Sequence, residues 1–170
     1  IAENKELAYP DFLDKTNQHL GLSYQVSQQS IENIPSRGRL VVIANHPLGS
    51  LDGLALLSLI RSVRPDVKIV VNELLWSIGP LRPFFLTVNN MGGGNSKEKL
   101  KQIQDVIADE QAVIFFPAGE VSRLSSRGIR DANWRSGFLK MAKQLKAPIL
   151  PAYVGGRNSK SFYALSLFTK

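Results

Sequence analysis

The residues best suited to acid–base chemistry are His46 and Asp52, which lie in the segment NHPLGSLD at residues 45–52. An aspartate beside one ring nitrogen of a histidine fixes the tautomer and leaves the other nitrogen free to take a proton. In a regular helix six residues advance the chain by about 600°, which would leave the two side chains roughly 120° apart. Pro47 and Gly49 interrupt that regularity. The segment therefore predicts a general base at His46 oriented by Asp52. The alternative is that His46 fills a buried polar niche and Asp52 caps a helix.

A second segment, FPAGEVSR at residues 116–123, offers groups that hold an anion. Gly119 supplies a turn, Glu120 a carboxylate, and Arg123 a guanidinium that can grip a phosphate or carboxylate through two parallel hydrogen bonds. We therefore expect Arg123 to bind an anionic group at the same edge of the sheet as His46. The alternative is a surface loop in which Glu120 and Arg123 are solvated.

A third segment, NNMGGGNSK at residues 89–97, is a glycine-rich turn between a strand and a helix. Backbone N–H groups at the start of a helix can cradle a phosphate. The spacing matches neither of the common glycine-rich nucleotide-binding patterns, so a flexible connection is the alternative.

The composition excludes several kinds of chemistry. The 170 residues include no cysteine and two histidines, which excludes disulfides, thiolate catalysis, thiolate zinc sites and three-histidine metal centres. No G-x-S-x-G motif supplies the nucleophile of a serine hydrolase. We expect no metal and no cofactor.

Basic residues are concentrated at one end of the chain. The net charge is +7, and residues 121–170 carry ten Lys and Arg against the single acid Asp131. Such a block suits anionic lipid, a phosphorylated cofactor or an acidic carrier protein. Nucleic acid is not expected, because few aromatic residues lie among these charges to stack on bases. Salt-sensitive, peripheral attachment to an anionic membrane is expected, since no apolar run approaches the roughly 18–20 residues that span a bilayer.

Short apolar runs alternate with amphipathic stretches along the chain. We expect a helix within residues 1–20, a strand at residues 22–26 where apolar and polar residues alternate, and then repeating strands and helices. The repeating strands are expected at 40–44, 67–71, 84–88, 112–116 and 148–154, and the helices at 51–63, 73–78, 96–109 and 134–145. This order predicts one α/β domain over residues 1–170, with a largely parallel central sheet flanked by helices. Ligands are expected at the carboxyl ends of the strands.

Taken in order, four motifs resemble the glycerolipid acyltransferases, the PlsC-like family of lysophosphatidate-type enzymes. They are Asn45-His46 with Asp52, FPAGEVSR at 116–123, Gly137 after WRS, and PILP at 148–151. The sequences NHPLG and FPAGE together look most like those of a bacterial branch of the family, which is often labelled hemolysin-like and is related to acyltransferases of ornithine lipid synthesis. The likeness covers about residues 39–159.

The chain departs from the usual family pattern in three places. Five residues separate His46 from Asp52 where the family has four, Glu120 follows the glycine of its motif, and residues around Asn89 and Asn90 replace an arginine that the family commonly has.

The resemblance implies an O-acyltransferase similar to 1-acylglycerol-3-phosphate acyltransferases. It would move a fatty acyl group from an acyl thioester, either acyl-CoA or acyl carrier protein, to a hydroxyl of a lysolipid. His46 would be the general base and Asp52 its partner. The substrate-binding residues that we expect are Asn45, Gly119, Glu120, Arg123 and Arg157.

The same resemblance implies a bacterial enzyme of phospholipid biosynthesis, cytoplasmic and peripheral on the inner face of the cell membrane. Because the chain does not begin with Met, we expect it to be a piece of a longer protein. The alternative to an enzyme is a lipid- or nucleotide-binding module that keeps the fold without turnover.

Overall fold

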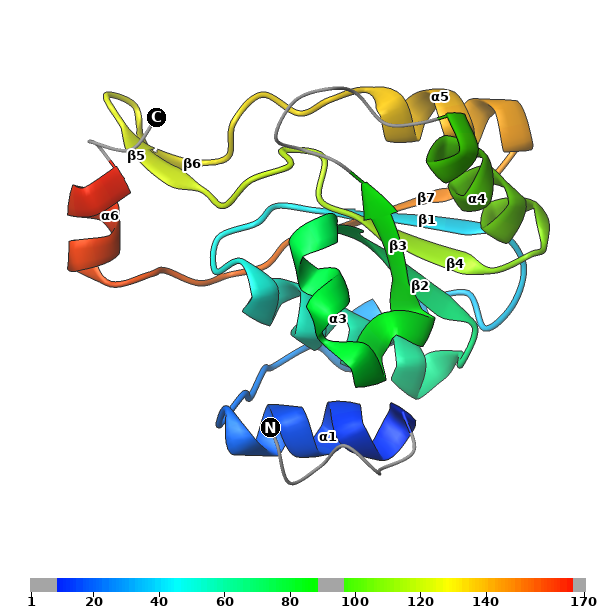
Figure 1. Ribbon diagram of the computed structural model, residues 1–170, viewed down its shortest axis with the longest axis horizontal. Helices are drawn as coiled ribbons and strands as arrows, with labels where there is room; N and C mark the ends of the chain where they lie inside the picture. Colours follow the sequence, from blue (N-terminus) through cyan, green and yellow to red (C-terminus); the bar gives the residue numbers. More distant parts are fainter. Residues whose placement is uncertain (1–8, 89–96, 167–170) are drawn as a thin grey trace.

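The computed structural model describes residues 9–88 and 97–166. Its centre is a five-stranded sheet in the order β3-β2-β4-β1-β7, in which every neighbouring pair is parallel (Figure 1). The strands are β1 (Leu40–Ala44), β2 (Val67–Asn72), β3 (Phe85–Val88), β4 (Ala112–Phe115) and β7 (Ile149–Ala152). The predicted α/β fold with a parallel sheet is confirmed.

Strand β1 shows why these runs become central strands. All five of its residues are buried, and it lies between β4 and β7 with Val42 opposite Ile114 on one side and Leu150 on the other. A strand covered on both faces needs apolar side chains on both, so it reads as a continuous apolar run.

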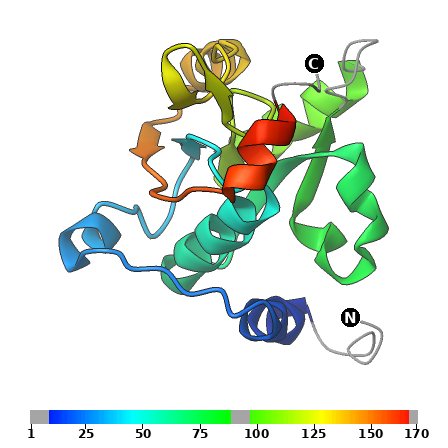
Figure 2. The same cartoon turned by 90° about the vertical axis from the view of Figure 1, so that its left-hand side faces the viewer.

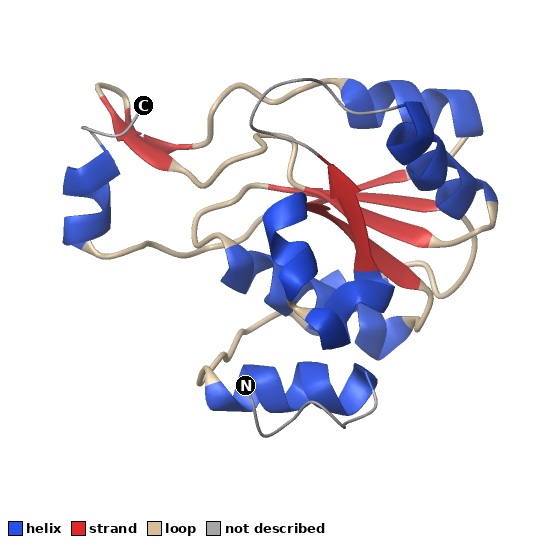
Figure 3. Cartoon of the chain, in the orientation of Figure 1, coloured by secondary structure: helices blue, strands red, loops and turns tan. Residues whose placement is uncertain are grey.

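Helices cover both faces of the sheet (Figure 3). One face carries α1 (Tyr9–His19), α3 (Ser50–Val63) and the 3-10 helices η2 (Glu73–Ser77) and η3 (Gly79–Phe84), and the opposite face carries α4 (Lys97–Ala108) and α5 (Gly137–Leu145). Leu57 and Ile60 of α3 pack in the first core, and Ile103 and Ile107 of α4 pack in the second. Helices α3 and α4 therefore bury the apolar stripes that their sequences predict.

Two expectations about the chain trace are wrong. Residues 22–26 form no strand, and Figure 2 shows them in the link between α1 and α2 (Gln28–Glu32). Leu22 and Val26 are half-buried there while Tyr24 is exposed, so the alternation reflects an extended segment on the surface with no neighbouring strand. Helix α5 begins at Gly137, three residues later than expected.

The sequence analysis missed four elements: α2, η3, the hairpin of β5 (Arg123–Ser125) and β6 (Gly128–Arg130), and α6 (Lys160–Ser166). The hairpin and α6 lie together at one end of the molecule (Figure 1). The glycine turn at 92–94, Asn89, Asn90 and Ser96, the first residue of the helix expected at 96–109, lie outside the described residues.

Within the described ranges, no helix combines the length and apolar character needed to cross a bilayer.

Candidate active site

The carboxyl ends of β1 and β4 carry the two segments that the sequence singles out. His46 lies two residues after β1, and Asp52 lies in the first turn of α3. Between them the backbone turns sharply at Gly49, whose φ of +79° is readily accessible only to glycine. The N–H of Asp52 donates to the carbonyl of Gly49 at 3.0 Å, which starts the helix and turns the aspartate back toward the strand end.

The His46 and Asp52 side chains are in contact. The imidazole Nδ1 lies 3.1 Å from Oδ2 of Asp52, in an approach that is off the line of a good hydrogen bond. The same oxygen accepts the N–H groups of Leu48 at 2.8 Å and Gly49 at 3.0 Å. The Asp52 side chain is fully buried, whereas that of His46 is 17% exposed. The carboxylate is thus fixed by the backbone, and the ring can meet a substrate.

Aromatic stacking sets the plane of the imidazole. The rings of His46 and Phe116 lie 4.0 Å apart at an angle of 27°. Because Nδ1 faces Asp52, Nε2 is the nitrogen left to accept a proton from a bound molecule.

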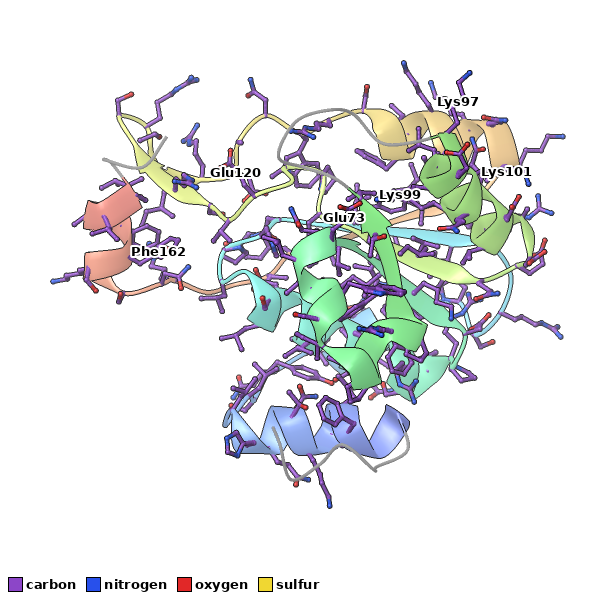
Figure 4. All side chains as sticks on the ribbon, viewed as in Figure 1. Glu73, Lys97, Lys99, Lys101, Glu120 and Phe162 are labelled. Carbon is purple, nitrogen blue, oxygen red and sulfur yellow. The ribbon has the colours of Figure 1, made fainter. Side chains whose placement is uncertain are left out.

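His46 lines a large apolar cavity of about 940 Å³. The walls come from both sides of the sheet: α1, α3, η2 and η3 on one side and α4 and α5 on the other. Lys99 of α4 forms an ion pair with Glu73 of η2, which links the two sides (Figure 4). Among the described lining residues, Arg135 and His46 are the only basic groups and no acid is present. Such a cavity can hold a long apolar chain with its reacting end at His46.

The comparisons with known proteins agree with this geometry. A family model described as acyltransferase matches residues 3–170. The chain belongs to this acyltransferase family. The four PlsC-like motifs predicted membership of an acyltransferase family, and the family match confirms that prediction.

Two curated relatives of this chain are both named lyso-glycine lipid O-acyltransferase. The protein from Bacteroides thetaiotaomicron is 34% identical over 98% of the chain, and the protein from Phocaeicola vulgatus is 29% identical over 100% of it. The chain spans 60% of the length of each relative. No solved structure shows a significant match to the chain.

One carboxylate that the sequence analysis missed organises the loop that carries His46. Asp131 accepts the backbone N–H of His46 at 3.2 Å, the hydroxyl of Ser122, and the indole N–H of Trp134 at 2.9 Å. The N–H of Ser122 in turn donates to the carbonyl of His46 at 2.8 Å. The signal in the sequence was that Asp131 is the single acid among residues 121–170.

The segment after β7 is hydrogen-bonded to the same loop, on either side of His46. The Asn45 amide both donates to the carbonyl of Val154 at 2.8 Å and accepts its N–H at 2.7 Å. Asn158 donates its side-chain N–H to the carbonyl of Pro47 at 2.8 Å. Asn45, which we expected at the substrate, is therefore engaged in joining β1 to this segment.

The other expected site residues are distributed over two places. Gly119 lines the cavity beside His46, in a turn where its φ is +72°. Arg123 donates to Glu120 at 3.0 Å, and neither residue lines that cavity. Figure 4 shows Glu120 near the β5–β6 hairpin. Arg157 is exposed in the segment after β7. Arg135, two residues before Gly137, is the cationic cavity residue that the sequence analysis did not single out.

Proposed function

We propose that this protein is an O-acyltransferase that moves a fatty acyl group from an acyl thioester, either acyl-CoA or acyl carrier protein, to a hydroxyl of a lysolipid. One observation carries the proposal: an imidazole backed by a buried carboxylate stands at the wall of an apolar cavity large enough for an acyl chain. The family match and the names of the two relatives support acyl transfer.

The mechanism that we infer uses His46 and Asp52 without a covalent enzyme intermediate. Nε2 of His46 takes the proton of the acceptor hydroxyl, and the oxygen attacks the thioester carbonyl. Asp52 holds Nδ1 and stabilises the imidazolium as its charge develops. The tetrahedral intermediate then breaks its C–S bond, and the thiol leaves with the proton from the imidazolium. The products are the ester of the lysolipid and the free thiol of the donor.

The acceptor that we propose is a lyso-glycine lipid rather than 1-acylglycerol-3-phosphate. Both relatives carry the name of a lyso-glycine lipid O-acyltransferase. Arg123, which we expected to bind a phosphate or a carboxylate, already donates to Glu120, so it would have to share that bond to hold an acceptor anion. A headgroup with a single carboxylate suits this weaker cationic site better than a phosphate does.

We also propose peripheral attachment to the inner, anionic face of the cell membrane. Some of the basic residues after position 120, those of the hairpin and of the start of α6, share one end of the molecule with exposed apolar side chains of the hairpin and α6 (Figure 1), which are Leu124, Ile129, Phe162 and Leu165. Each basic residue near an anionic surface adds about 1 kcal/mol, and salt weakens the effect. Co-sedimentation with anionic vesicles at low salt that is lost at high salt is the expected result. Absence of binding at low salt would contradict it.

A thiol-release assay tests the proposed reaction. Acyl-CoA and acyl carrier protein thioesters are offered with a panel of lysolipids, and wild type is compared with His46→Ala. Loss of a general base lowers the rate by about 10² to 10⁴, so kcat should fall at least 100-fold. His19→Ala removes the other histidine, which is exposed at the end of α1, and should leave turnover unchanged.

The same assay distinguishes the rival function. A binding module that keeps the fold without turnover would bind the lipids and release no thiol. Wild-type turnover in His46→Ala would eliminate the proposed mechanism.

A further inference from the structure

A second cavity, of about 820 Å³, lies on the other side of the loop that carries His46. Asn45 and Pro47, which flank His46, line this cavity, whereas His46 lines the first one. The remaining walls come from Ser122, from the β5–β6 hairpin, from residues 131–134, and from Tyr153, Val154, Gly156 and Arg157 after β7. A molecule bound across the loop could therefore place one part in each cavity.

The second cavity is cationic where the first is apolar. Arg130 and Arg157 line it, and neither guanidinium has a hydrogen-bond or ion-pair partner in the described part of the chain. Asp131 is the one acid among the described lining residues, and both of its oxygens already accept hydrogen bonds. The two guanidinium charges are thus left for a ligand.

Both arginines are held on backbone that is tied to the His46 loop. Arg130 precedes Asp131, which binds the N–H of His46. Arg157 stands between Gly156 and Asn158, and Asn158 donates to the carbonyl of Pro47. Gly156 lies so close to Leu48 that an added Cβ would come within 2.8 Å of its Cδ1. Ligand groups bound by these arginines would therefore have a fixed position relative to the imidazole.

We propose that Arg130 and Arg157 form the binding site for the anionic group of a substrate whose reacting end lies at His46. The inference rests on the proposed acyl transfer. A guanidinium binds phosphate and carboxylate through the same charge-assisted hydrogen bonds, so the ligand is either the phosphates of a coenzyme A donor or the headgroup carboxylate of the acceptor.

Kinetics of Arg130→Gln, Arg157→Gln and the double variant test the site. Arg127→Gln is the matched control, because Arg127 is an exposed arginine of the same hairpin that does not line the cavity. In the donor arm, acyl-CoA is compared with the acyl thioester of pantetheine, which has no phosphate. In the acceptor arm, a lyso-glycine lipid is compared with its methyl ester.

Loss of a hydrogen bond to a charged group should raise KM about 10-fold or more for the charged substrate of one arm, with kcat nearly unchanged. The uncharged analogue should show no such rise. A rise for acyl-CoA alone identifies the phosphates, and a rise for the free carboxylate alone identifies the headgroup. Unchanged KM values, equal rises for charged and uncharged forms, or an equal effect of Arg127→Gln would overturn the proposal.

A binding measurement separates this site from the reaction. Inorganic pyrophosphate should raise the Tm of the wild type and of Arg127→Gln, and should do so less for the double variant. If no substrate pair reacts but this difference is present, the proposed function fails and the anion site stands. If neither the Tm difference nor a KM change is found, the anion site is wrong.

Discussion

Oδ1 of Asp131 lies 3.2 Å from the backbone nitrogen of His46, a residue 85 positions earlier in the chain. The carboxylate does not touch the imidazole. It holds the main chain that carries the ring, together with the Ser122 hydroxyl and the Trp134 indole. Asp131 is therefore a positioning residue, and its effect on catalysis should pass through the placement of His46.

Asp131→Ala should lower kcat about 10- to 100-fold, because displacement of a catalytic group by about 1 Å is enough for such a loss. Thiol release measures the rate, and circular dichroism measures the folded fraction. Asp131→Asn keeps an oxygen for the His46 N–H but loses an acceptor for Trp134, so it should recover part of the rate. A loss that merely follows the unfolded fraction would contradict a positioning role.

Asp52 has two separable tasks, since one oxygen both accepts two backbone N–H groups and lies against Nδ1 of His46. Asp52→Asn keeps an acceptor for the N–H groups but removes the charge that stabilises the imidazolium. We expect kcat to fall by at least 10-fold with a small change in Tm. Asp52→Ala also removes the acceptor at the helix start, which should cost about a further 1 kcal/mol of stability. Similar activity of Asp52→Asn and wild type would refute the charge role.

Gly137 offers a way to test the apolar cavity. It lines the cavity, and an added Cβ meets no heavy atom within 4 Å. Gly137→Leu should therefore fold and fill part of the space for the acyl chain. Each methylene group of the acyl chain that is excluded from the cavity costs about 0.8 kcal/mol of binding free energy. Exclusion of two such groups should lower kcat/KM by about 10-fold, and only for thioesters with long acyl chains. Ser136→Leu adds the same side chain outside the cavity lining and serves as control. Equal losses for short and long thioesters would argue against an acyl site.

The buried Arg64 predicts acid sensitivity. Its Nε and Nη2 donate to the two oxygens of Asp66 at 2.8 and 2.7 Å, and these hydrogen bonds lower the pKa of Asp66 from 3.8. A lowered pKa in the folded state stabilises the protein above the unfolded value, and this contribution is lost as the pH falls through the folded value. The free energy of unfolding should therefore decrease below about pH 4.

Urea unfolding at neutral and acid pH measures this contribution. Asp66→Asn should lower stability at pH 7 by about 1–2 kcal/mol, less than for a fully buried pair because Asp66 is 38% exposed. It should also reduce the loss of stability on acidification. Asp105→Asn removes an exposed partner of Lys101, and it should leave the stability at pH 7 and its loss on acidification nearly unchanged. A wild-type pH dependence in Asp66→Asn would show that Asp66 is not the group responsible.

The strands of the sheet could be predicted wherever burial leaves an unmistakable pattern. Residues 40–44 are apolar without interruption and form β1 with those bounds, because both faces of the strand are covered. The alternating residues 22–26 have a pattern that also fits an extended surface link, so the strand predicted there was wrong. The β5–β6 hairpin is short, and all its residues except Arg123 are exposed, so no apolar pattern marks it.

By itself the sequence determined the order along the chain of the five strands of the main sheet and the pairing of His46 with Asp52, because burial patterns and a six-residue turn are local properties of the chain. Tertiary structure alone decided that Asp131 holds His46 and that Arg130 and Arg157 share a cavity. The reason is that these side chains meet through strand ends and loops that only the packing of the sheet brings together. Spacing along the chain carries no measure of such a distance.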